Sequence, residues 1–145
     1  MAFSVSSTRE GNYAAYALED DTSGARAVVV PERGGIITRW RVGDRPLLYL
    51  DGDRFADPGK SIRGGIPILF PICGNLENDQ YEWKGKTYSL KQHGFARDMA
   101  WEVGDQTTDN GAALTLKLAS TEATREVYPF DFEVEFTYRL LGRSL

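Results

Sequence analysis

The sequence predicts an all-β protein built from antiparallel strands, arranged as a β-sandwich or a barrel. Apolar and polar residues alternate with a period of two over several stretches, as they do in a half-buried strand. No window keeps apolar residues at helical spacing with caps at both ends. The 15 glycines and 6 prolines fall largely at the boundaries of the alternating stretches. We therefore expect short strands joined by turns.

The clearest strand candidate is "FDFEVEFTYRL", residues 130–140. Its apolar residues share one face and its polar residues share the other; the apolar face carries Phe130, Phe132, Val134, Phe136, Tyr138 and Leu140. Because an apolar strand face must be covered, we expect a second layer against it. A free edge beside such a strand would invite pairing with another chain.

The remaining strand candidates are shorter runs bounded by turn residues. In "YEWKGKTYSL" the pair Lys84 and Gly85 predicts the turn of a hairpin, and "DNG" at 109–111 predicts a turn before the alternating leucines that follow it. "TEATREVYP", from residue 121, predicts one or two helical turns at most. The expected strands outside the hairpin and residues 130–140 are 25–31, 35–42, 45–50 and 112–120.

Composition and charge exclude several classes of protein. The length predicts one domain, residues 1–145, and the net charge of −4 argues against a nucleic-acid partner, which needs clustered positive charge. One cysteine, Cys73, and one histidine, His93, exclude an internal disulfide and a zinc site of four usual ligands. The N-terminus has no signal-peptide pattern and no 18 apolar residues occur in a row, so we expect a cytoplasmic protein without a membrane partner.

The segment "SIRGGIPILFPICGNL" (61–76) is unusual for a strand protein. Two glycines bring the backbone close to a neighbour, and Arg63 carries a fork of donors suited to carboxylate, phosphate or sugar hydroxyls. A glycine bulge, with Arg63 either solvated or paired to an acid, explains the same residues without a function. "RGGI" also occurs at 33–36, and because the flanking residues differ we interpret the two as separate glycine turns.

The segment "KQHGFARDMAW" (91–101) gathers an amide, an imidazole and a guanidinium within six residues. Gln92 donates and accepts, His93 exchanges a proton near neutral pH, and Arg97 is a fixed cation, a set that suits a polyhydroxylated ligand. Alternatively, His93 is a polar residue beside a turn and Arg97 lies on the surface.

Other reactive side chains predict no site by themselves. We interpret Phe95 and Trp101 as core residues and Cys73 as a small buried filler, since no second histidine is present to activate it. The loop acids form neither a calcium-loop spacing nor an identifiable catalytic pair; they are Asp51, Asp53, Asp57, Glu77 and Asp79.

Taken together, "PERGGIITRW", "IRGGIPILFPICG" and "KQHGFARDMAW", in this order, resemble the N-terminal half of the aldose 1-epimerase superfamily. They are most similar to its hexose-6-phosphate 1-epimerase branch. The resemblance covers essentially all 145 residues but about half of a member's usual length. It implies a β-sandwich that forms part of a galactose-mutarotase-like supersandwich, with a hexose or hexose 6-phosphate as substrate and no cofactor or metal.

The resemblance also implies a role for each site residue. Arg63, Gln92 and Arg97 match positions that bind the sugar or its phosphate, and His93 matches a histidine that polarises the substrate near the reacting centre. The family's main proton donor, a second histidine, and its glutamate base lie in the half that would follow residue 145. We therefore expect an interconversion of α and β anomers that this polypeptide alone performs weakly or not at all.

Two consequences and two alternatives remain open. Apolar faces left uncovered predict self-association or pairing with a complementary fragment. One alternative function is a noncatalytic module that binds sugar or sugar phosphate; the other is a β-sandwich scaffold whose edge binds another protein.

Overall fold

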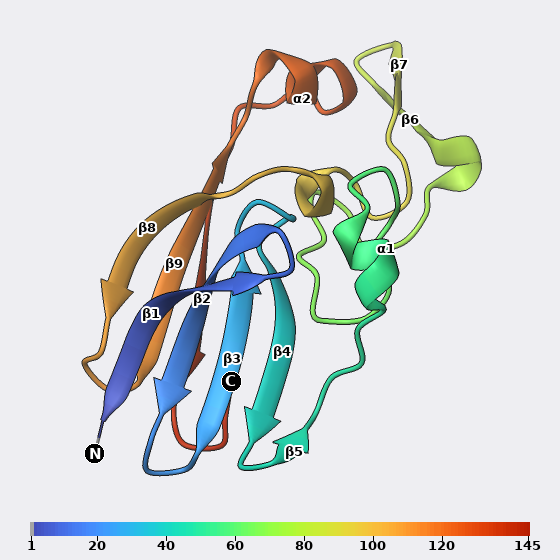
Figure 1. Cartoon of the computed structure of the whole chain (residues 1–145). Helices are drawn as coiled ribbons and strands as arrows, with labels where there is room; N and C mark the ends of the chain where they lie inside the picture. The colour runs from blue at the N-terminus through green and yellow to red at the C-terminus, as the bar shows by residue number, and fades with distance from the viewer. Residues whose placement is uncertain (1) are drawn as a thin grey trace.

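Two antiparallel sheets face each other in the computed structural model, which describes residues 2–145 (Figure 1). One sheet has five strands in the order β1-β2-β3-β4-β5, and the other has three in the order β10-β9-β8. A separate hairpin pairs β6 with β7. The predicted all-β, antiparallel sandwich is therefore confirmed.

Simple up-and-down connections build the five-stranded sheet. Its strands are β1 (Phe3–Glu10), β2 (Tyr13–Asp20), β3 (Ala25–Val30), β4 (Ile36–Val42) and β5 (Arg45–Pro46). The predicted strands at 25–31 and 35–42 are thus present as β3 and β4. β1 and β2 lay outside the predicted strands, although side-chain burial in β1 largely alternates along the strand.

The predicted strand at 45–50 is wrong beyond its second residue. The Leu47 N–H still donates to the Trp40 carbonyl at 2.8 Å, but the chain then leaves the sheet, and Leu50 makes only an isolated bridge with Gly64. Tyr49 is 71% exposed, so an apolar run here does not mark a buried strand. Residues 45–46 pair with β4, and no strand lies beyond β5 within residues 2–145, so residues 48–50 leave the sheet at its open edge.

The three-stranded sheet comprises β8 (Glu102–Thr107), β9 (Ala112–Ala119) and β10 (Glu133–Leu140). Between the last two lies α2 (Glu122–Val127), the predicted short helix. Thr121 and Thr124 cap its N-terminus with a reciprocal capping box. The strand expected over 130–140 starts three residues late, because the Phe130 N–H bonds to the Tyr128 carbonyl instead of to β9.

The core lies between the two sheets and confirms the predicted second layer. Alternate residues of β9 point into it, and Trp101, 4% exposed, closes one side. The principal buried members are Leu18, Ala27, Val29, Ile37, Trp101, Leu114, Leu116, Leu118, Tyr138 and Leu140. Burial of this apolar area is the main stabilising contribution to the sandwich.

The apolar face of β10 is only partly covered. Tyr138 and Leu140 are buried, whereas Phe136 on the same face is 38% exposed. β10 is also an edge strand of its sheet within the described residues. The open edge and the exposed ring lie on the same element.

A smaller cluster packs on the outer face of the five-stranded sheet. α1 (Gly52–Ala56), which the sequence did not predict, begins at Asp51, whose side chain accepts the Arg54 N–H. Phe55 of this helix is 3% exposed and contacts the ring of Tyr13 edge-on, with 5.3 Å between the ring centroids. One buried phenylalanine thereby anchors a five-residue helix to the sheet.

The hairpin of β6 (Gln80–Trp83) and β7 (Lys86–Ser89) turns at Lys84 and Gly85, as predicted. Both turn residues have positive φ, 50° and 75°, which suits a two-residue hairpin turn. The hairpin and α2 lie together at one end of the sandwich (Figure 1). Trp83 contacts Phe130 there, with ring centroids 4.7 Å apart.

At the opposite end, Asp20 ties the last turn of the chain to the β2–β3 turn. Its carboxylate, 4% exposed at the residue level, accepts the backbone N–H groups of Thr22 and Gly142, each at 2.9 Å, and of Ser23 at 3.4 Å. Burial raises the pKa of Asp20, but these hydrogen bonds outweigh it and hold the pKa below its ordinary value.

Candidate functional site

The two segments singled out in the sequence lie side by side. The backbone N–H groups of Phe95 and Ala96 both donate to the Phe70 carbonyl, at 3.0 and 3.1 Å, and Phe70 forms a parallel bridge with Gly94. A Cβ atom on Gly94 would lie 2.6 Å from Cδ of Pro71, so only glycine permits this approach. Residues 63–74 and 92–97 therefore form one unit.

His93 is fixed to this unit by a reciprocal pair of hydrogen bonds with Gly74. The His93 N–H donates to the Gly74 carbonyl, and the Gly74 N–H donates to Nδ1 of His93, each at 2.8 Å. Because Nδ1 accepts, the neutral imidazole carries its hydrogen on Nε2. His93 is half-buried with φ 65°, and its Nε2–H is a donor for a ligand oxygen.

Arg97 lies in η2 (Ala96–Asp98), a single 3₁₀ turn. The indole N–H of Trp101 holds this turn by donating to the Ala96 carbonyl at 3.0 Å. Nη2 of Arg97 makes a long bond of 3.4 Å to the Gln92 carbonyl, while its buried Nε has no partner among the described residues. The guanidinium therefore keeps unused donors.

The turn between β3 and β4 supports Arg97 from behind. Gly34 packs so closely that a Cβ atom there would overlap the Arg97 carbonyl oxygen and lie 2.7 Å from Cα of Arg97. The Tyr138 hydroxyl donates to the carbonyl of the neighbouring Gly35 at 2.7 Å. Burial raises the pKa of Tyr138, so the hydroxyl stays a donor at physiological pH.

Arg63 and Gln92 are exposed. The Arg63 carbonyl accepts the Asp51 N–H at 2.9 Å, and its Nη1 donates to Oγ of Ser61 at 3.0 Å. Gln92 contributes its backbone carbonyl to Arg97, and its side chain faces solvent. Arg63 is thus oriented by protein contacts, whereas the Gln92 side chain is not.

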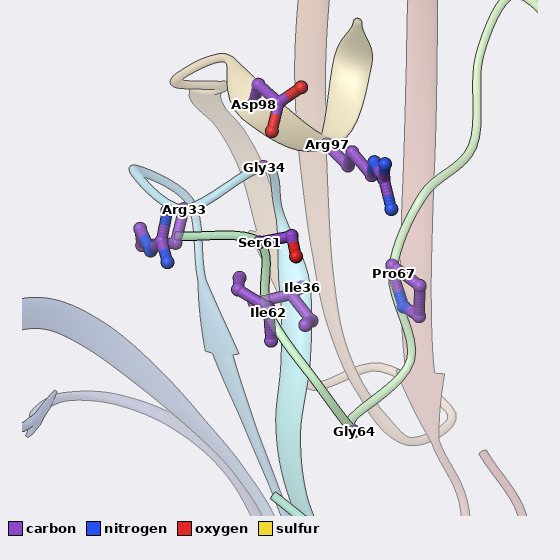
Figure 2. Close-up of a pocket in the computed structure, with 9 residues that line it drawn as sticks. All are labelled: Arg33, Gly34, Ile36, Ser61, Ile62, Gly64, Pro67, Arg97 and Asp98. Atoms are coloured by element: carbon purple, nitrogen blue, oxygen red, sulfur yellow. The ribbon is translucent and has the colours of Figure 1, made fainter. Parts of the chain in front are cut away.

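A small cavity of about 40 Å³ adjoins this unit (Figure 2). It has room for a few water molecules or a small anion and not for a whole hexose. Arg97 is the only one of the four predicted site residues that lines it; the full set is Arg33, Gly34, Ile36, Ser61, Ile62, Gly64, Pro67, Arg97 and Asp98. Figure 2 shows the Ser61 hydroxyl and the Arg97 guanidinium among the groups that line the cavity.

A larger hollow, of about 420 Å³, lies beside the same segment at the base of the hairpin. Lys91, Gly94 and Phe95 line it together with residues of β7 and α2, and its walls are mostly apolar. None of the four predicted site residues contributes to it.

Four arginines around the small cavity lack a carboxylate partner within residues 2–145: Arg33, Arg54, Arg63 and Arg97. They donate to backbone carbonyls or to Ser61 instead. Among the acids nearby, Asp57 pairs with Lys60 and Asp98 with Lys91. This concentration of uncompensated positive charge, in a chain of net charge −4, suits an anionic ligand.

Sequence reasoning missed part of this surface. Arg33 reaches it because the residue after the first "RGGI" tetrapeptide pairs with the end of the second, through reciprocal backbone hydrogen bonds between Ile37 and Ile66 at 3.1 and 2.8 Å. Ser61 stands two positions before the second tetrapeptide, which was the available signal. No signal in the sequence marked Arg54, because its position depends on α1, which was not predicted.

Of the remaining predictions for single side chains, some are confirmed and one is wrong. Trp101 is a core residue as predicted, and Phe95 is half-buried in an aromatic cluster with Phe70, Tyr128 and Phe132. The prediction that Cys73 is a buried filler is wrong: it is exposed in the loop leading to Gly74. Within residues 2–145, no three His, Cys, Asp or Glu side chains gather as a metal site would require.

Residues 16–145 match the sequence family described as "Aldose 1-epimerase". The chain belongs to the aldose 1-epimerase family. Among solved structures, this epimerase-family chain is similar to the Slr1438 protein from Synechocystis, with 53% identity and a TM-score of 0.88 over 98% of this chain and 48% of that one. It is also similar to a galactose mutarotase related enzyme from Lactobacillus acidophilus, with 35% identity and a TM-score of 0.71 over 88% of this chain and 39% of that one.

Among curated relatives, the chain is 34% identical over 102 residues to a Salmonella typhimurium protein named "Putative glucose-6-phosphate 1-epimerase". The match covers 69% of this aldose 1-epimerase family chain and 32% of the relative. The chain thus spans about a third of that curated relative and about half of the Slr1438 structure. No helix within residues 2–145 has both the length and the apolar character needed to cross a bilayer.

Proposed function

We propose that this chain forms the sugar-binding part of a 1-epimerase site that interconverts the α and β anomers of an aldose or a hexose 6-phosphate. The observation that carries the proposal is the unit of residues 63–74 and 92–97, which fixes His93 through Nδ1 and also contains Arg63 and Arg97, neither of them paired with a carboxylate within residues 2–145. The name of the Salmonella typhimurium relative supports glucose 6-phosphate as a substrate.

Each site residue has a proposed role that its chemistry supports. Arg63 and Arg97 bind the phosphate or the sugar hydroxyls, because their guanidinium donors are not engaged by carboxylates. Gln92, with an exposed side-chain amide, donates to and accepts from hydroxyls. His93 donates from Nε2 to a substrate oxygen and stabilises the negative charge that develops there. The reaction needs no cofactor or metal.

Ring opening also needs a general acid at the ring oxygen and a general base at the anomeric hydroxyl. His93 is the single histidine of the 145 residues, and its Nδ1 is occupied by Gly74. We propose that the main acid, a histidine, and the base, a glutamate, come from residues outside these 145. Since each contributes roughly 10² to 10⁴ fold, the 145-residue polypeptide alone should catalyse mutarotation weakly or not at all.

We propose that residues 1–145 are one folding unit corresponding to the N-terminal half of an epimerase domain. The edge of β10 and the 38% exposed Phe136 favour a covering polypeptide, either a complementary segment or a second copy. Light scattering of the isolated chain, with and without the matching half of a relative, tests this: a monomer that neither self-associates nor binds that half would contradict it. The exposed thiol of Cys73 fits a reducing cytoplasm, which is the compartment we propose.

Titration with glucose 6-phosphate and with glucose, followed by NMR, tests the binding role. We expect chemical-shift changes at the amides of His93 and Arg97. Arg97→Ala should weaken the affinity for glucose 6-phosphate about tenfold, since the loss of a hydrogen bond to a charged group has this magnitude. Arg143→Ala is the matched control, because Arg143 is an exposed arginine in the turn beside Asp20. Equal binding by both variants would remove the proposed role.

Polarimetry then separates enzyme from binding module. Supplying the matching half of a relative should raise the rate of mutarotation of glucose 6-phosphate by several orders of magnitude. Binding without any gain in rate would favour the noncatalytic sugar-phosphate module.

A further inference from the structure

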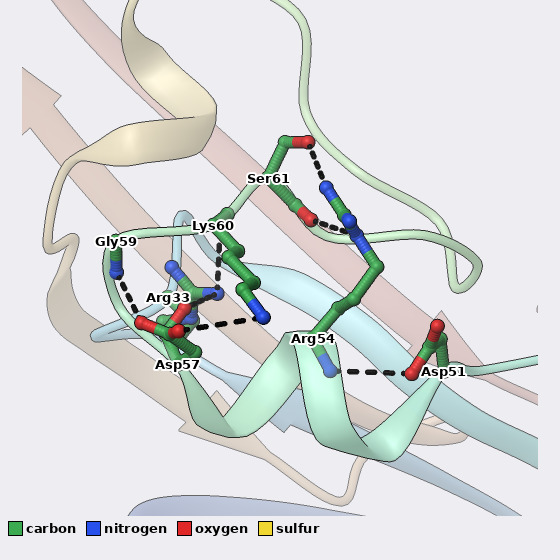
Figure 3. Close-up of polar contacts among 7 residues, drawn as sticks. All are labelled: Arg33, Asp51, Arg54, Asp57, Gly59, Lys60 and Ser61. Atoms are coloured by element: carbon green, nitrogen blue, oxygen red, sulfur yellow. Dashed lines mark hydrogen bonds and ion pairs between the residues drawn. The ribbon is translucent and has the colours of Figure 1, made fainter.

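One serine hydroxyl accepts hydrogen bonds from two arginines. Oγ of Ser61 accepts from Nη2 of Arg54 and from Nη1 of Arg63, each at 3.0 Å. Nε of Arg54 also donates to the Ser61 carbonyl at 3.0 Å, so Arg54 binds Ser61 at two points, as Figure 3 shows. Because both lone pairs of Oγ are used, its own hydrogen is directed away from the two arginines.

The position of Arg54 is set by the fold. It belongs to α1 and directly precedes Phe55, the buried anchor of that helix. The backbone of Arg63 is fixed from the same helix, since Asp51, the residue that caps α1, donates its N–H to the Arg63 carbonyl. Only the long side chain of Arg63 would be free to move, and Ser61 holds it.

Two guanidinium groups on one oxygen repel each other, and neither has a carboxylate partner within residues 2–145. Such an arrangement is relieved when a ligand brings negative charge. Oγ of Ser61 accepts from Arg63, and Ser61 lines the same cavity as Arg97 (Figure 2). The cavity has the size of a small anion and not of a sugar ring.

We propose that Ser61 is a positioning residue that sets the Arg63 guanidinium for the anionic group of a phosphorylated sugar, with Arg54 holding Ser61 in place. This inference rests on the proposed function, in which Arg63 binds the substrate. Ser61 acts through Arg63, so its effect belongs to the phosphorylated ligand and not to the neutral sugar.

The test measures the dissociation constants of glucose 6-phosphate and of glucose for variants of the full 145-residue chain. Ser61→Ala should weaken glucose 6-phosphate binding about tenfold, the lower end for a hydrogen bond to a charged group, and leave glucose within about twofold. Ser61→Thr keeps the hydroxyl and should restore most of the affinity. Ser7→Ala, an exposed serine of β1, is the matched control and should change neither constant.

The double variant decides whether Ser61 acts through Arg63. In the Arg63→Ala background, Ser61→Ala should have no further effect on glucose 6-phosphate binding. If Arg63→Ala weakens binding while Ser61→Ala does not, or if the two losses add fully, the positioning role is overturned and the proposed function stands. If Arg63→Ala itself leaves the affinity unchanged, the proposed role of Arg63 is overturned first.

Arg54→Lys serves if Ser61→Ala does not fold. A lysine keeps the positive charge but cannot donate to the carbonyl and the hydroxyl of Ser61 together. It should therefore reproduce the selective loss of glucose 6-phosphate affinity. An unchanged affinity in a folded Arg54→Lys chain would overturn the role assigned to Arg54 and Ser61.

Discussion

Replacing Gly34 by alanine should destabilise the protein through one specific contact. Gly34 has φ +73°, and a Cβ atom there would lie 2.5 Å from the carbonyl carbon of Arg97 and 2.7 Å from its Cα. These neighbours are backbone atoms of η2, whose turn is also held by Trp101. The chain must move at one segment or the other, because backbone cannot rotate away as a side chain can.

The magnitude follows from two costs. A residue other than glycine in the left-handed region costs about 1–2 kcal/mol, and forcing an extra methyl into packed structure costs about 1–3 kcal/mol. Gly34→Ala should therefore lower the free energy of unfolding by about 2–5 kcal/mol. Gly43→Ala is the matched control, since Gly43 has φ +58° and a Cβ atom added to it would meet no other atom within 4 Å; it should cost only about 1–2 kcal/mol.

Urea denaturation of the two variants measures the difference, and glucose 6-phosphate titration measures its effect on the site. Gly34→Ala should also weaken binding, because Arg97 shifts with its backbone. Losses of unfolding free energy that agree within about 0.5 kcal/mol, the usual scatter for independent sites, would refute the claim that Gly34 supports Arg97.

Three further outcomes are expected. Tyr138→Phe leaves the Gly35 carbonyl without its buried partner and should cost about 1–3 kcal/mol in urea denaturation. Leu116→Ala opens a cavity in the centre of the core and should cost about 2–5 kcal/mol by the same assay. Asp20→Asn removes a carboxylate whose folded pKa lies below its unfolded value, so the stabilisation is present above the unfolded pKa and is lost as the pH falls through the folded pKa. The stability difference between wild type and Asp20→Asn should therefore be constant near neutral pH and shrink below about pH 4, measured by thermal denaturation across pH; a difference that grows on acidification would contradict this.

The alternation of apolar and polar residues predicted strands best where one face of the strand is buried and the other faces solvent. β9 shows this, with Leu114 and Leu116 buried on either side of Thr115. In β2, by contrast, both faces are largely covered, since the sandwich core lies on one and the α1 cluster on the other, so Ala17 and Leu18 are both 0% exposed and no period of two is visible. The run at 45–50 failed for a different reason: its residues are strand-like, but the chain pairs with β4 only over its first residues and then leaves the sheet.

The site divides in the same way. The association of residues 63–74 with 92–97 was predictable in outline from the family resemblance, which implies that both segments contribute to one site, and the structure places them side by side. The contacts of Ser61 with Arg54 were not predictable, because they depend on the packing of Phe55 of α1 against Tyr13 of β2. The exposure of Cys73 likewise depends on the path of the loop and not on its apolar neighbours.

The isolated bridges described above have a consequence for how substrate preference can change. Residues 47–76 are attached to the rest of the fold through isolated bridges, Ile37 with Ile66 and Phe70 with Gly94, and not through a continuous ladder; the bridge of Leu50 with Gly64 lies within the segment. A substitution or a one-residue insertion between two such attachments should alter the outline of the proposed sugar site while every strand keeps its register. The strands of the two sheets and the proposed recognition surface can therefore be changed independently of each other.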